Sequence, residues 1–156
     1  MTKMKKALLS LIFLTCLAAL ALTGCANFST YVCYTYQLDN GDAVEVELDT
    51  TDGYTFSPDL PFFVKKDGHV LSRGAIITAD EYDAYLQAVQ ADPTATILDS
   101  GKGDGIRYTF YAYGEAEFDH LILISGSETG ILLANPNSQE EAQACFERLT
   151  FRPAQP

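Results

Sequence analysis

The stretch YVCYTYQLDNGDAVEVEL, residues 31–48, decides which kind of fold this chain builds. Apolar and polar side chains alternate along residues 31–38 and again along residues 44–48, and Asp39-Asn40-Gly41-Asp42 lies between the two runs. Alternation with a period of two is typical of a β-strand, and Asn-Gly between two such runs predicts a hairpin with a type I′ turn. The sequence therefore predicts that the folded part of the chain begins with two antiparallel strands.

The same turn predicts the register of the hairpin, because a two-residue loop at Asn40 and Gly41 determines which residues face each other. In that register Cys33 pairs with Leu48 and lies on the apolar face of the hairpin. We therefore expect Cys33 to point into the core. The opposite face is expected to carry Tyr34, Tyr36, Glu45 and Glu47.

Two capping boxes mark the starts of two helices. The segments are Thr78-Ala79-Asp80-Glu81 and Ser138-Gln139-Glu140-Glu141. In each, the hydroxyl oxygen can accept a hydrogen bond from the backbone N–H of the glutamate, and the glutamate carboxylate can accept one from the backbone N–H of the hydroxyl residue. Apolar residues then recur at the spacing of one helical face in both segments. The sequence predicts amphipathic helices over about 79–91 and 139–150.

The other apolar segments are joined mostly by short turns, so neighbouring strands should run antiparallel. We expect an α+β fold: a mainly antiparallel sheet carrying two amphipathic helices, in one domain over residues 31–151, with a tail over 152–156. The order of the elements resembles the PsbP/Mog1-type α/β sandwich, in which a central antiparallel sheet carries helices. That resemblance implies an accessory or binding protein.

The first 25 residues have the layout of an export signal. Lys3, Lys5 and Lys6 precede an uncharged apolar run from residue 7 to 21, and Leu22-Thr23-Gly24-Cys25 follows. This ending resembles the lipobox of bacterial lipoproteins. The resemblance implies that residues 1–24 are removed as a signal peptide and that Cys25 is diacylated. Residues 25–30 then become a lipidated tether on the extracytoplasmic side of the membrane. The alternative is an ordinary cleaved signal with an incidental cysteine.

The chain is strongly acidic. It carries 10 Lys and Arg against 21 Asp and Glu, a net charge of −11. Loss of residues 1–24 removes three lysines and no acid, which leaves seven basic residues and a net charge of −14. Such a surface argues against nucleic acid as a partner, because phosphate binding needs a basic patch. Anionic lipid would also repel it, so attachment to the membrane should depend on the lipid anchor on Cys25.

Two cysteines remain for the folded part, because Cys16 leaves with the signal and Cys25 carries lipid. Cys33 is expected on the core face of the first strand, and Cys145 on the buried stripe of the last helix. An exported protein can bridge such a pair, so a Cys33–Cys145 disulfide is one prediction. The alternative is two separate buried thiols. A metal site is not expected, because neither cysteine has a CxxC partner or a nearby histidine.

No catalytic set can be assembled from the sequence, and no cofactor is expected. His120 shares a strand face with Ile122 and Ile124, which is typical of a packed or edge histidine rather than of a general base. Residues 126–130 read GSETG, but their centre is Glu128 rather than serine, and they join two strands, where a nucleophile elbow joins a strand to a helix. The glycine-rich segment 99–105 is interpreted as a hairpin loop rather than a calcium loop, since it lacks the flanking helices and the final glutamate.

Tyrosines on two strands are the remaining candidates for a binding surface. Exposed tyrosines suit recognition of a peptide or glycan, since each offers a large contact area with a polar tip. The alternative is that the first helix, with Tyr82 and Tyr85, covers them as a second core layer. The candidate residues are Tyr34, Tyr36, Tyr111 and Tyr113.

The function that these observations predict is a lipid-anchored, extracytoplasmic bacterial lipoprotein. It would be a non-catalytic binding or accessory module of the cell envelope, with an unknown protein, peptide or envelope component as its ligand. One alternative is an envelope hydrolase that uses carboxylates, which would need two carboxylates in one cleft with one pKa raised. The other is a purely structural surface domain.

Overall fold

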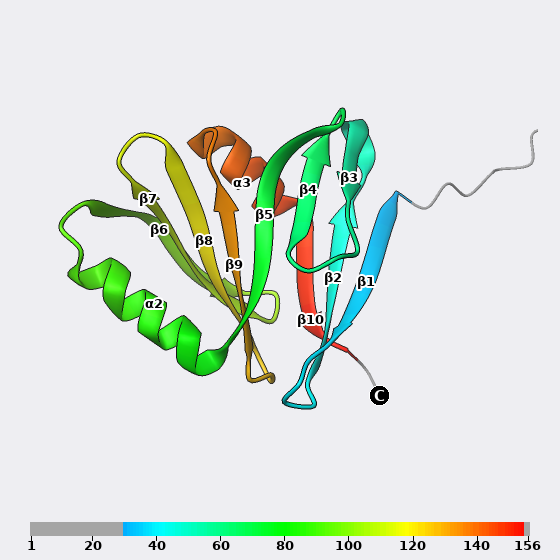
Figure 1. The fold of residues 1–156 in the computed structure, drawn as a ribbon, viewed down its shortest axis with the longest axis horizontal. Helices are drawn as coiled ribbons and strands as arrows, with labels where there is room; N and C mark the ends of the chain where they lie inside the picture. The colour runs from blue at the N-terminus through cyan, green and yellow to red at the C-terminus, as the bar shows by residue number, and fades with distance from the viewer. Residues whose placement is uncertain (1–29, 155–156) are drawn as a thin grey trace, which may run out of the picture.

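The computed structural model describes residues 30–154, so the predicted signal peptide, Cys25 and most of the predicted tether lie outside the described residues. Two antiparallel sheets and two helices make up this part of the chain (Figure 1). The expected mainly antiparallel sheet with two helices is confirmed, and strand outweighs helix. The three-stranded sheet has the order β1 (Tyr31–Gln37), β2 (Ala43–Asp49), β10 (Leu149–Pro153).

The larger sheet has seven strands. Its order is β3 (Tyr54–Phe56), β4 (Phe62–Lys66), β5 (His69–Thr78), β9 (Thr129–Asn135), β8 (Glu117–Ile124), β7 (Ile106–Tyr113), β6 (Ala95–Gly103). The helices are α2 (Ala79–Ala91) and α3 (Gln139–Glu147), and a short 3-10 turn, η1 (Thr51–Gly53), precedes β3. Helix α2 lies along one side of the seven-stranded sheet, and the three-stranded sheet lies on the other side (Figure 1).

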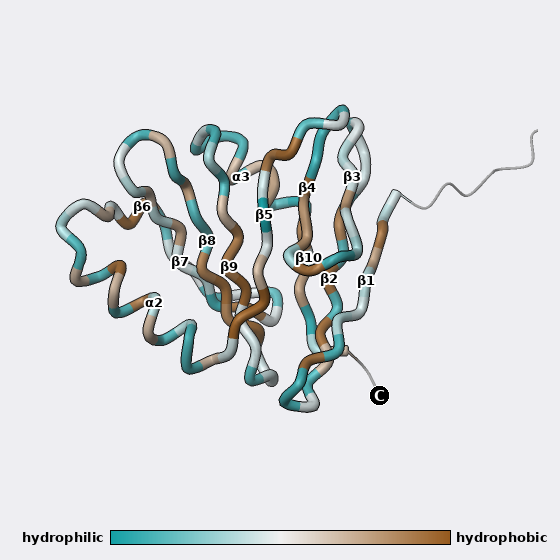
Figure 2. The backbone as a smooth tube through the Cα atoms, viewed as in Figure 1, coloured by the Kyte–Doolittle hydropathy of each residue, from teal (hydrophilic) through white to brown (hydrophobic). Residues whose placement is uncertain are grey.

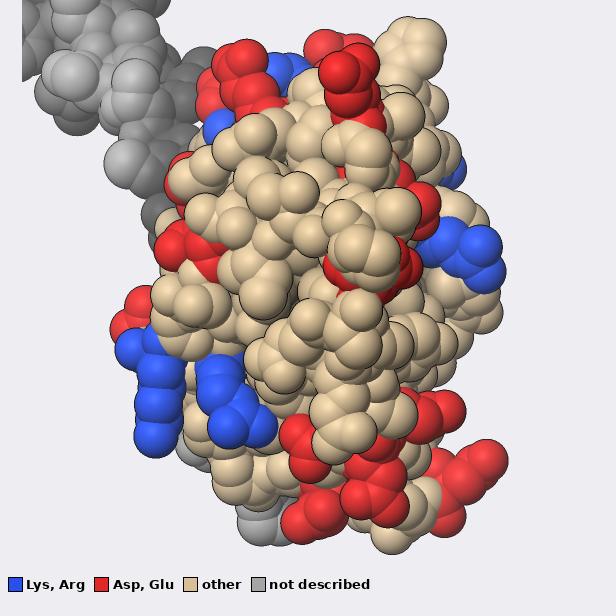
Figure 3. Space-filling view, turned by 90° about the vertical axis from the view of Figure 1, so that its left-hand side faces the viewer, with Lys and Arg blue, Asp and Glu red and all other residues tan. Residues whose placement is uncertain are grey.

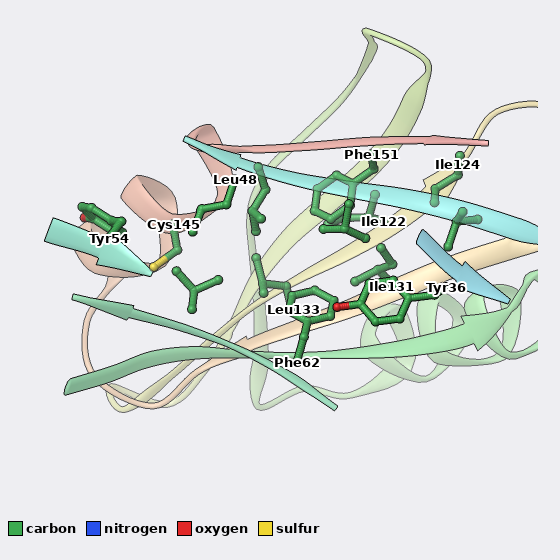
Figure 4. Close-up of a cluster of buried hydrophobic side chains, with 14 of the residues drawn as sticks. Tyr36, Leu48, Tyr54, Phe62, Ile122, Ile124, Ile131, Leu133, Cys145 and Phe151 are labelled. Carbon is green, nitrogen blue, oxygen red and sulfur yellow. The ribbon is translucent and has the colours of Figure 1, made fainter. Parts of the chain in front are cut away.

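The main core fills the space between the two sheets and extends under α3 (Figure 4). Its side chains come from eight strands of the two sheets and from α3, and the most hydrophobic stretches of backbone run through β8 and β9 (Figure 2). Both faces of these strands are covered, so consecutive residues are apolar: every second residue faces the main core and those between face the α2 side. The largest fully buried apolar side chains here are Phe62, Phe151, Leu48, Ile122, Ile124, Ile131 and Leu133.

A smaller core lies on the opposite face of the seven-stranded sheet, beneath α2. Tyr82 and Val89 of the helix pack there against Tyr111 and Leu121 of the sheet. Helix α2 begins and ends where the sequence predicts. Thr78 accepts a hydrogen bond from the backbone N–H of Glu81 and the Glu81 carboxylate accepts one from the Thr78 N–H, which completes the capping box.

The second helix is shorter than predicted. Helix α3 ends at Glu147, and Leu149 begins strand β10, which pairs antiparallel with β2. Leu149 continues the helical spacing of apolar residues, so the sequence pattern alone cannot tell the two apart. Pairing with the edge of β2 decides it, because that edge offers backbone hydrogen bonds and a place in the core for Phe151. The predicted tail accordingly begins later, since β10 continues to Pro153.

The register of the β1–β2 hairpin differs by one residue from the prediction. Cys33 faces Glu47 rather than Leu48, and Tyr36 faces Val44. The loop has three residues: the Gly41 N–H donates to the Leu38 carbonyl at 3.0 Å, and only Gly41 takes a positive φ, of 92°. This is a type I turn followed by a glycine bulge, whereas a type I′ turn needs positive φ at both central residues.

A tertiary contact explains the difference in register. The Asp42 carboxylate accepts hydrogen bonds from Ser127 Oγ at 2.9 Å, from the Glu128 N–H at 2.9 Å and from Thr129 Oγ1 at 3.1 Å. These bonds attach the end of the hairpin to the turn between β8 and β9. A slip of one residue moves every side chain to the other face, so Tyr36 enters the core and Cys33 leaves it.

Candidate functional site

A groove beside α3 is built from an interruption in strand β6. The pairing of β6 with β7 shifts between Ile97 and Asp99, so Ile97 pairs with Tyr111 while Asp99 pairs with Phe110. Such a bulge re-aims the side chains that follow it. Partners in adjacent strands share a face, and Phe110 and Tyr111 lie on opposite faces of the sheet. The bulge therefore brings Asp99 to the α3 side.

Four rings form a continuous stack across this groove. The His120 ring lies 4.0 Å from Phe110 and 4.2 Å from Phe146 between ring centroids, nearly parallel to both. Tyr108 lies 4.9 Å from Phe146. Gly101 leaves room for Tyr108, because a Cβ at that position would lie 2.7 Å from the tyrosine ring. The stack joins the β7–β8 hairpin to α3, which follows it in the chain after β9.

His120 is the buried centre of the stack, and only 2% of its surface is exposed. Burial lowers the pKa of His120 from 6.5 to about 3, so the ring is neutral at physiological pH. Its Nδ1 has no hydrogen-bond partner within residues 30–154. Of the two positions expected from the sequence, packed or at an edge, the structure shows the packed one. A histidine with this pKa is a poor general base near neutrality, because its optimum pKa for that role lies near the operating pH.

Polar groups line the rim of the groove. The Tyr108 hydroxyl donates to Asp99 Oδ2 at 2.8 Å, and this hydrogen bond raises the pKa of Tyr108. On α3, Gln143 Nε2 donates to Glu147 Oε1 at 3.0 Å. Within residues 30–154, neither Asp99 nor Glu147 forms an ion pair with a lysine or arginine. The groove therefore carries negative charge without a cation to balance it.

Two hollows make up the groove, and they share Phe146 and Glu147. The smaller, of about 160 Å³, has His120 in its wall. The larger, of about 570 Å³, continues toward β10 and has an apolar wall. The smaller hollow is lined by Asp99, Tyr108, Phe110, His120, Gln143, Phe146 and Glu147, and the larger by Asp104, Ile106, Phe146, Glu147, Leu149, Thr150 and Phe151.

The two cysteines do not form the disulfide considered from the sequence. Cys145 is buried under α3 and Cys33 is exposed on the outer face of the three-stranded sheet, and both are free thiols. The one-residue change of register is the physical reason, since it turns Cys33 away from the core. Burial and the nearby Glu45 raise the pKa of the Cys33 thiol, despite an Arg152 guanidinium nitrogen 4.0 Å from its Sγ.

The four candidate tyrosines do not share an exposed face. Tyr36 is 6% exposed and stacks on Phe62, while Tyr34 packs on the rim of the main core. Tyr111 is 3% exposed beneath α2, with Tyr113 beside it. The second pair thus follows the alternative reading of a second core layer under the first helix. Tyr34 and Tyr36 face the main core because the observed register of the β1–β2 hairpin turns them inward.

Sequence reasoning missed the groove because its parts meet only in the folded chain. Each segment was predicted to have a buried side. The signals were the alternation along residues 106–113, the apolar strand face that carries His120, and the apolar helix stripe that contains Phe146. Nothing in the sequence showed that these three surfaces meet. The bulge that turns Asp99 toward them also lacked a signal, since no glycine or proline lies between Ile97 and Asp99.

Comparisons with protein-family models, curated proteins and solved structures found no match to the chain. The class that the fold defines is a layered, mainly antiparallel α+β domain with an acidic, aromatic groove. Among residues 30–154, no helix is long and apolar enough to cross a membrane. Within the same residues, no cluster of three or more His, Cys, Asp or Glu side chains is arranged to hold a metal ion.

Proposed function

We propose that the protein is a lipid-anchored binding module of the bacterial cell envelope. The observation that carries this proposal is the Leu22-Thr23-Gly24-Cys25 motif, which follows a basic segment and an apolar run. Acyl chains on Cys25 would hold the domain at the extracytoplasmic face of the membrane. Residues 26–30 are the only chain between Cys25 and β1, and five residues span at most about 18 Å. The domain would therefore lie close to the bilayer.

The groove beside α3 supports a binding function rather than a catalytic one. It is open, it has aromatic and apolar walls, and its carboxylates lack cationic partners within residues 30–154. The histidine in its wall is held neutral by burial. A concave surface with apolar walls and a few polar groups at its rim is the usual form of a ligand site.

Metabolic labelling tests the anchor. The full chain is expressed in a bacterium supplied with an alkyne-bearing fatty acid, and the expected result is label on the mature protein in the membrane fraction. Cys25→Ala should abolish the label, and Cys33→Ala is the matched control that should keep it. Label that survives Cys25→Ala would refute the anchor.

Photo-crosslinking in living cells tests the binding function. A photoreactive amino acid at Thr150, in the wall of the larger hollow, should give one discrete adduct. The same amino acid at Glu115, in the turn between β7 and β8, is the control and should give none. Absence of any adduct at Thr150 would favour a purely structural surface domain.

A pair of carboxylates in the smaller hollow favours a second candidate, a carboxylate-dependent hydrolase. Asp99 and Glu147 line the same hollow, and two carboxylates in one cleft are the minimum for acid–base hydrolysis. The buried Asp119, whose pKa is raised to about 6 by burial, lines neither hollow of the groove. Release of label from a labelled cell-wall polysaccharide, lost in Asp99→Asn, would support this candidate.

The resemblance to the PsbP/Mog1-type sandwich is likewise a proposal. It is supported by the layered arrangement, in which a central antiparallel sheet carries helices on both faces. A match in strand order to a member of that family would strengthen it, and a different order would exclude it.

A further inference from the structure

The acidic groove beside α3 has features that point to the chemistry of its ligand. Asp99 and Glu147 flank the smaller hollow, and Asp104 lies at the mouth of the larger one. The lining of both hollows contains no lysine or arginine. Carboxylates without a cationic partner favour a cation as ligand, because a charge-assisted hydrogen bond is stronger than a neutral one.

A buried polar group lies in the wall of the same hollow. His120 is 98% buried, and its Nδ1 has no hydrogen-bond partner within residues 30–154. Buried polar atoms are nearly always satisfied, so one that is not calls for a specific explanation. A neutral imidazole carries one acceptor nitrogen and one N–H donor, so this unpaired nitrogen marks a polar point beside the hollow and does not by itself select the charge of the ligand. The aromatic faces of Phe146 and Tyr108 add a surface that attracts cations.

The larger hollow adds a free strand edge. Strand β10 is an edge strand: it pairs with β2 on one side, and no strand of the described chain pairs with its other edge. Three consecutive residues of β10, Leu149 to Phe151, line the hollow. An unpaired edge beside a hollow can accept an extended peptide as an additional strand, with alternate side chains entering pockets. A small free cation would make no use of this edge.

The distribution of charge on the neighbouring side of the molecule is mainly acidic, which agrees with attraction of a cationic ligand. Figure 3 faces the side of the molecule that carries β6 and α2, and shows acidic side chains gathered at its upper and lower ends. Between them lies a band that is largely without charge. Basic side chains lie only at its margins. Charge of one sign at such a surface attracts ligands of the opposite sign and raises their rate of association.

We infer that this groove binds an extended peptide segment of a partner protein, with a lysine or arginine head in the hollow between Asp99 and Glu147. The peptide backbone lies along the free edge of β10. The inference rests on the proposed binding function and gives that function a ligand class.

Fluorescence anisotropy with a defined peptide tests the inference. The purified full chain in detergent micelles is titrated into fluorescein-labelled (Val-Lys)₃, which is expected to bind, while (Val-Glu)₃ is expected not to bind. Asp99→Asn and Glu147→Gln should each weaken binding of (Val-Lys)₃ about tenfold. Glu115→Gln is the matched control, since it removes one exposed carboxylate that lines neither hollow and should leave the affinity unchanged.

Two further arms make the outcome decisive. A (Val-Lys)₃ peptide with N-methyl groups on alternate amides should lose binding, because it cannot pair with β10. Spermidine should compete weakly, and competition as strong as that of the peptide would overturn the assignment of a peptide ligand. No binding of (Val-Lys)₃, or an equal loss in Glu115→Gln, would also overturn it. Circular dichroism on each variant checks that the fold is retained.

This test is separate from the test of the anchor. Cys25→Ala should bind (Val-Lys)₃ as the wild type does, because every residue of the groove lies within 99–151. Failure of fatty-acid labelling would remove the proposed anchor and leave the groove untouched. Failure of peptide binding would remove the ligand class and leave the anchor in place.

Discussion

The two faces of the seven-stranded sheet are covered in different ways. One face packs against a second sheet and α3, and fifteen buried residues form a continuous core there. The other face is covered by α2 alone, over four buried residues. The first arrangement encloses side chains between two sheets, whereas the second only shields a patch. We conclude that the first face supplies most of the stability, since burial of apolar surface is the main favourable contribution to folding.

Two neighbouring residues of strand β8 lie on the two differently covered faces of the sheet. Asp119 points toward α2 and His120 toward α3, and both are less than 5% exposed. Burial raises the pKa of Asp119 to about 6 and lowers the pKa of His120 to about 3. Both shifts favour the neutral form, because burial disfavours charge of either sign. The free energy of unfolding therefore changes with pH in opposite directions for the two residues, so each face can be tested by its own pH dependence.

The largest expected effect comes from the core between the sheets. Phe62→Ala removes a ring with 0% exposure that stacks on Tyr36 and meets Phe56 edge to face, and should lower the free energy of unfolding by about 3–5 kcal/mol. Val89→Ala, under α2, should lower it by about 1.5 kcal/mol, at about 0.8 kcal/mol for each buried methylene. Urea unfolding measures both, and equal losses would contradict the contrast between the faces.

The second effect concerns His120 and acid. Between pH 6.5 and about 3 the unfolded chain binds a proton that the native state does not, so stability falls as the pH falls. His120→Phe, which preserves the stack, should remove about 3 kcal/mol of this loss at pH 4. Urea unfolding at a series of pH values measures it. The matched change at the exposed His69, to glutamine, should leave the acid limb in place.

The third effect has the opposite sign and belongs to the α2 face. The pKa of Asp119 is raised from 3.8 to about 6, so the native state holds a proton that the unfolded chain has released between these values. Stability therefore falls as pH rises through this window. Asp119→Asn should remove this dependence and stabilise the protein by about 3 kcal/mol at pH 7, at about 1.4 kcal/mol for each pKa unit. Thermal unfolding at pH 4 and pH 7 measures it, and a variant that is less stable at both would argue against a protonated Asp119.

The smallest effect compares the helix on each face. Thr78→Ala removes both bonds that the Thr78 hydroxyl makes with Glu81 but keeps the backbone N–H that donates to the Glu81 carboxylate, and Ser138→Ala removes one cap bond from α3. Each should cost about 1 kcal/mol, with the larger loss for Thr78. Hydrogen exchange of the first-turn amides is the measurement. A larger loss for Ser138 would show that the cap of α3 depends on more than its hydroxyl.

Turn chemistry shows how far sequence patterns could predict this fold. Asp67-Gly68 and Asp104-Gly105 both take positive φ at two residues, as type I′ hairpins require, and the strands on either side pair without a slip at the turn. Asn40-Gly41 carries an equally strong signal, yet it forms a three-residue loop. The difference lies in Asp42, whose carboxylate bonds to a turn more than 80 residues away.

The same distinction applies to the groove. Local periodicity predicted the buried sides of the strand over residues 106–113 and of the last helix. It also favoured a packed or edge position for His120, which is packed. The contact between these surfaces could not be predicted, because it depends on the packing of α3 across β7 and β8. The placement of Asp99 also depends on a bulge that has no local signal. Sites made from distant segments are therefore the least predictable part of this chain.

The sequence by itself determined the antiparallel strands, the start of both helices and the bounds of α2, because alternation and capping are local properties of a few adjacent residues. Only the tertiary structure decided which face of β1 is buried, whether Cys33 meets Cys145, and where α3 gives way to β10. Each of these depends on a partner distant in sequence: Asp42 on the β8–β9 turn, and Phe151 on the edge of β2. A shift of one residue changes no local preference, but it exchanges the two faces of a strand.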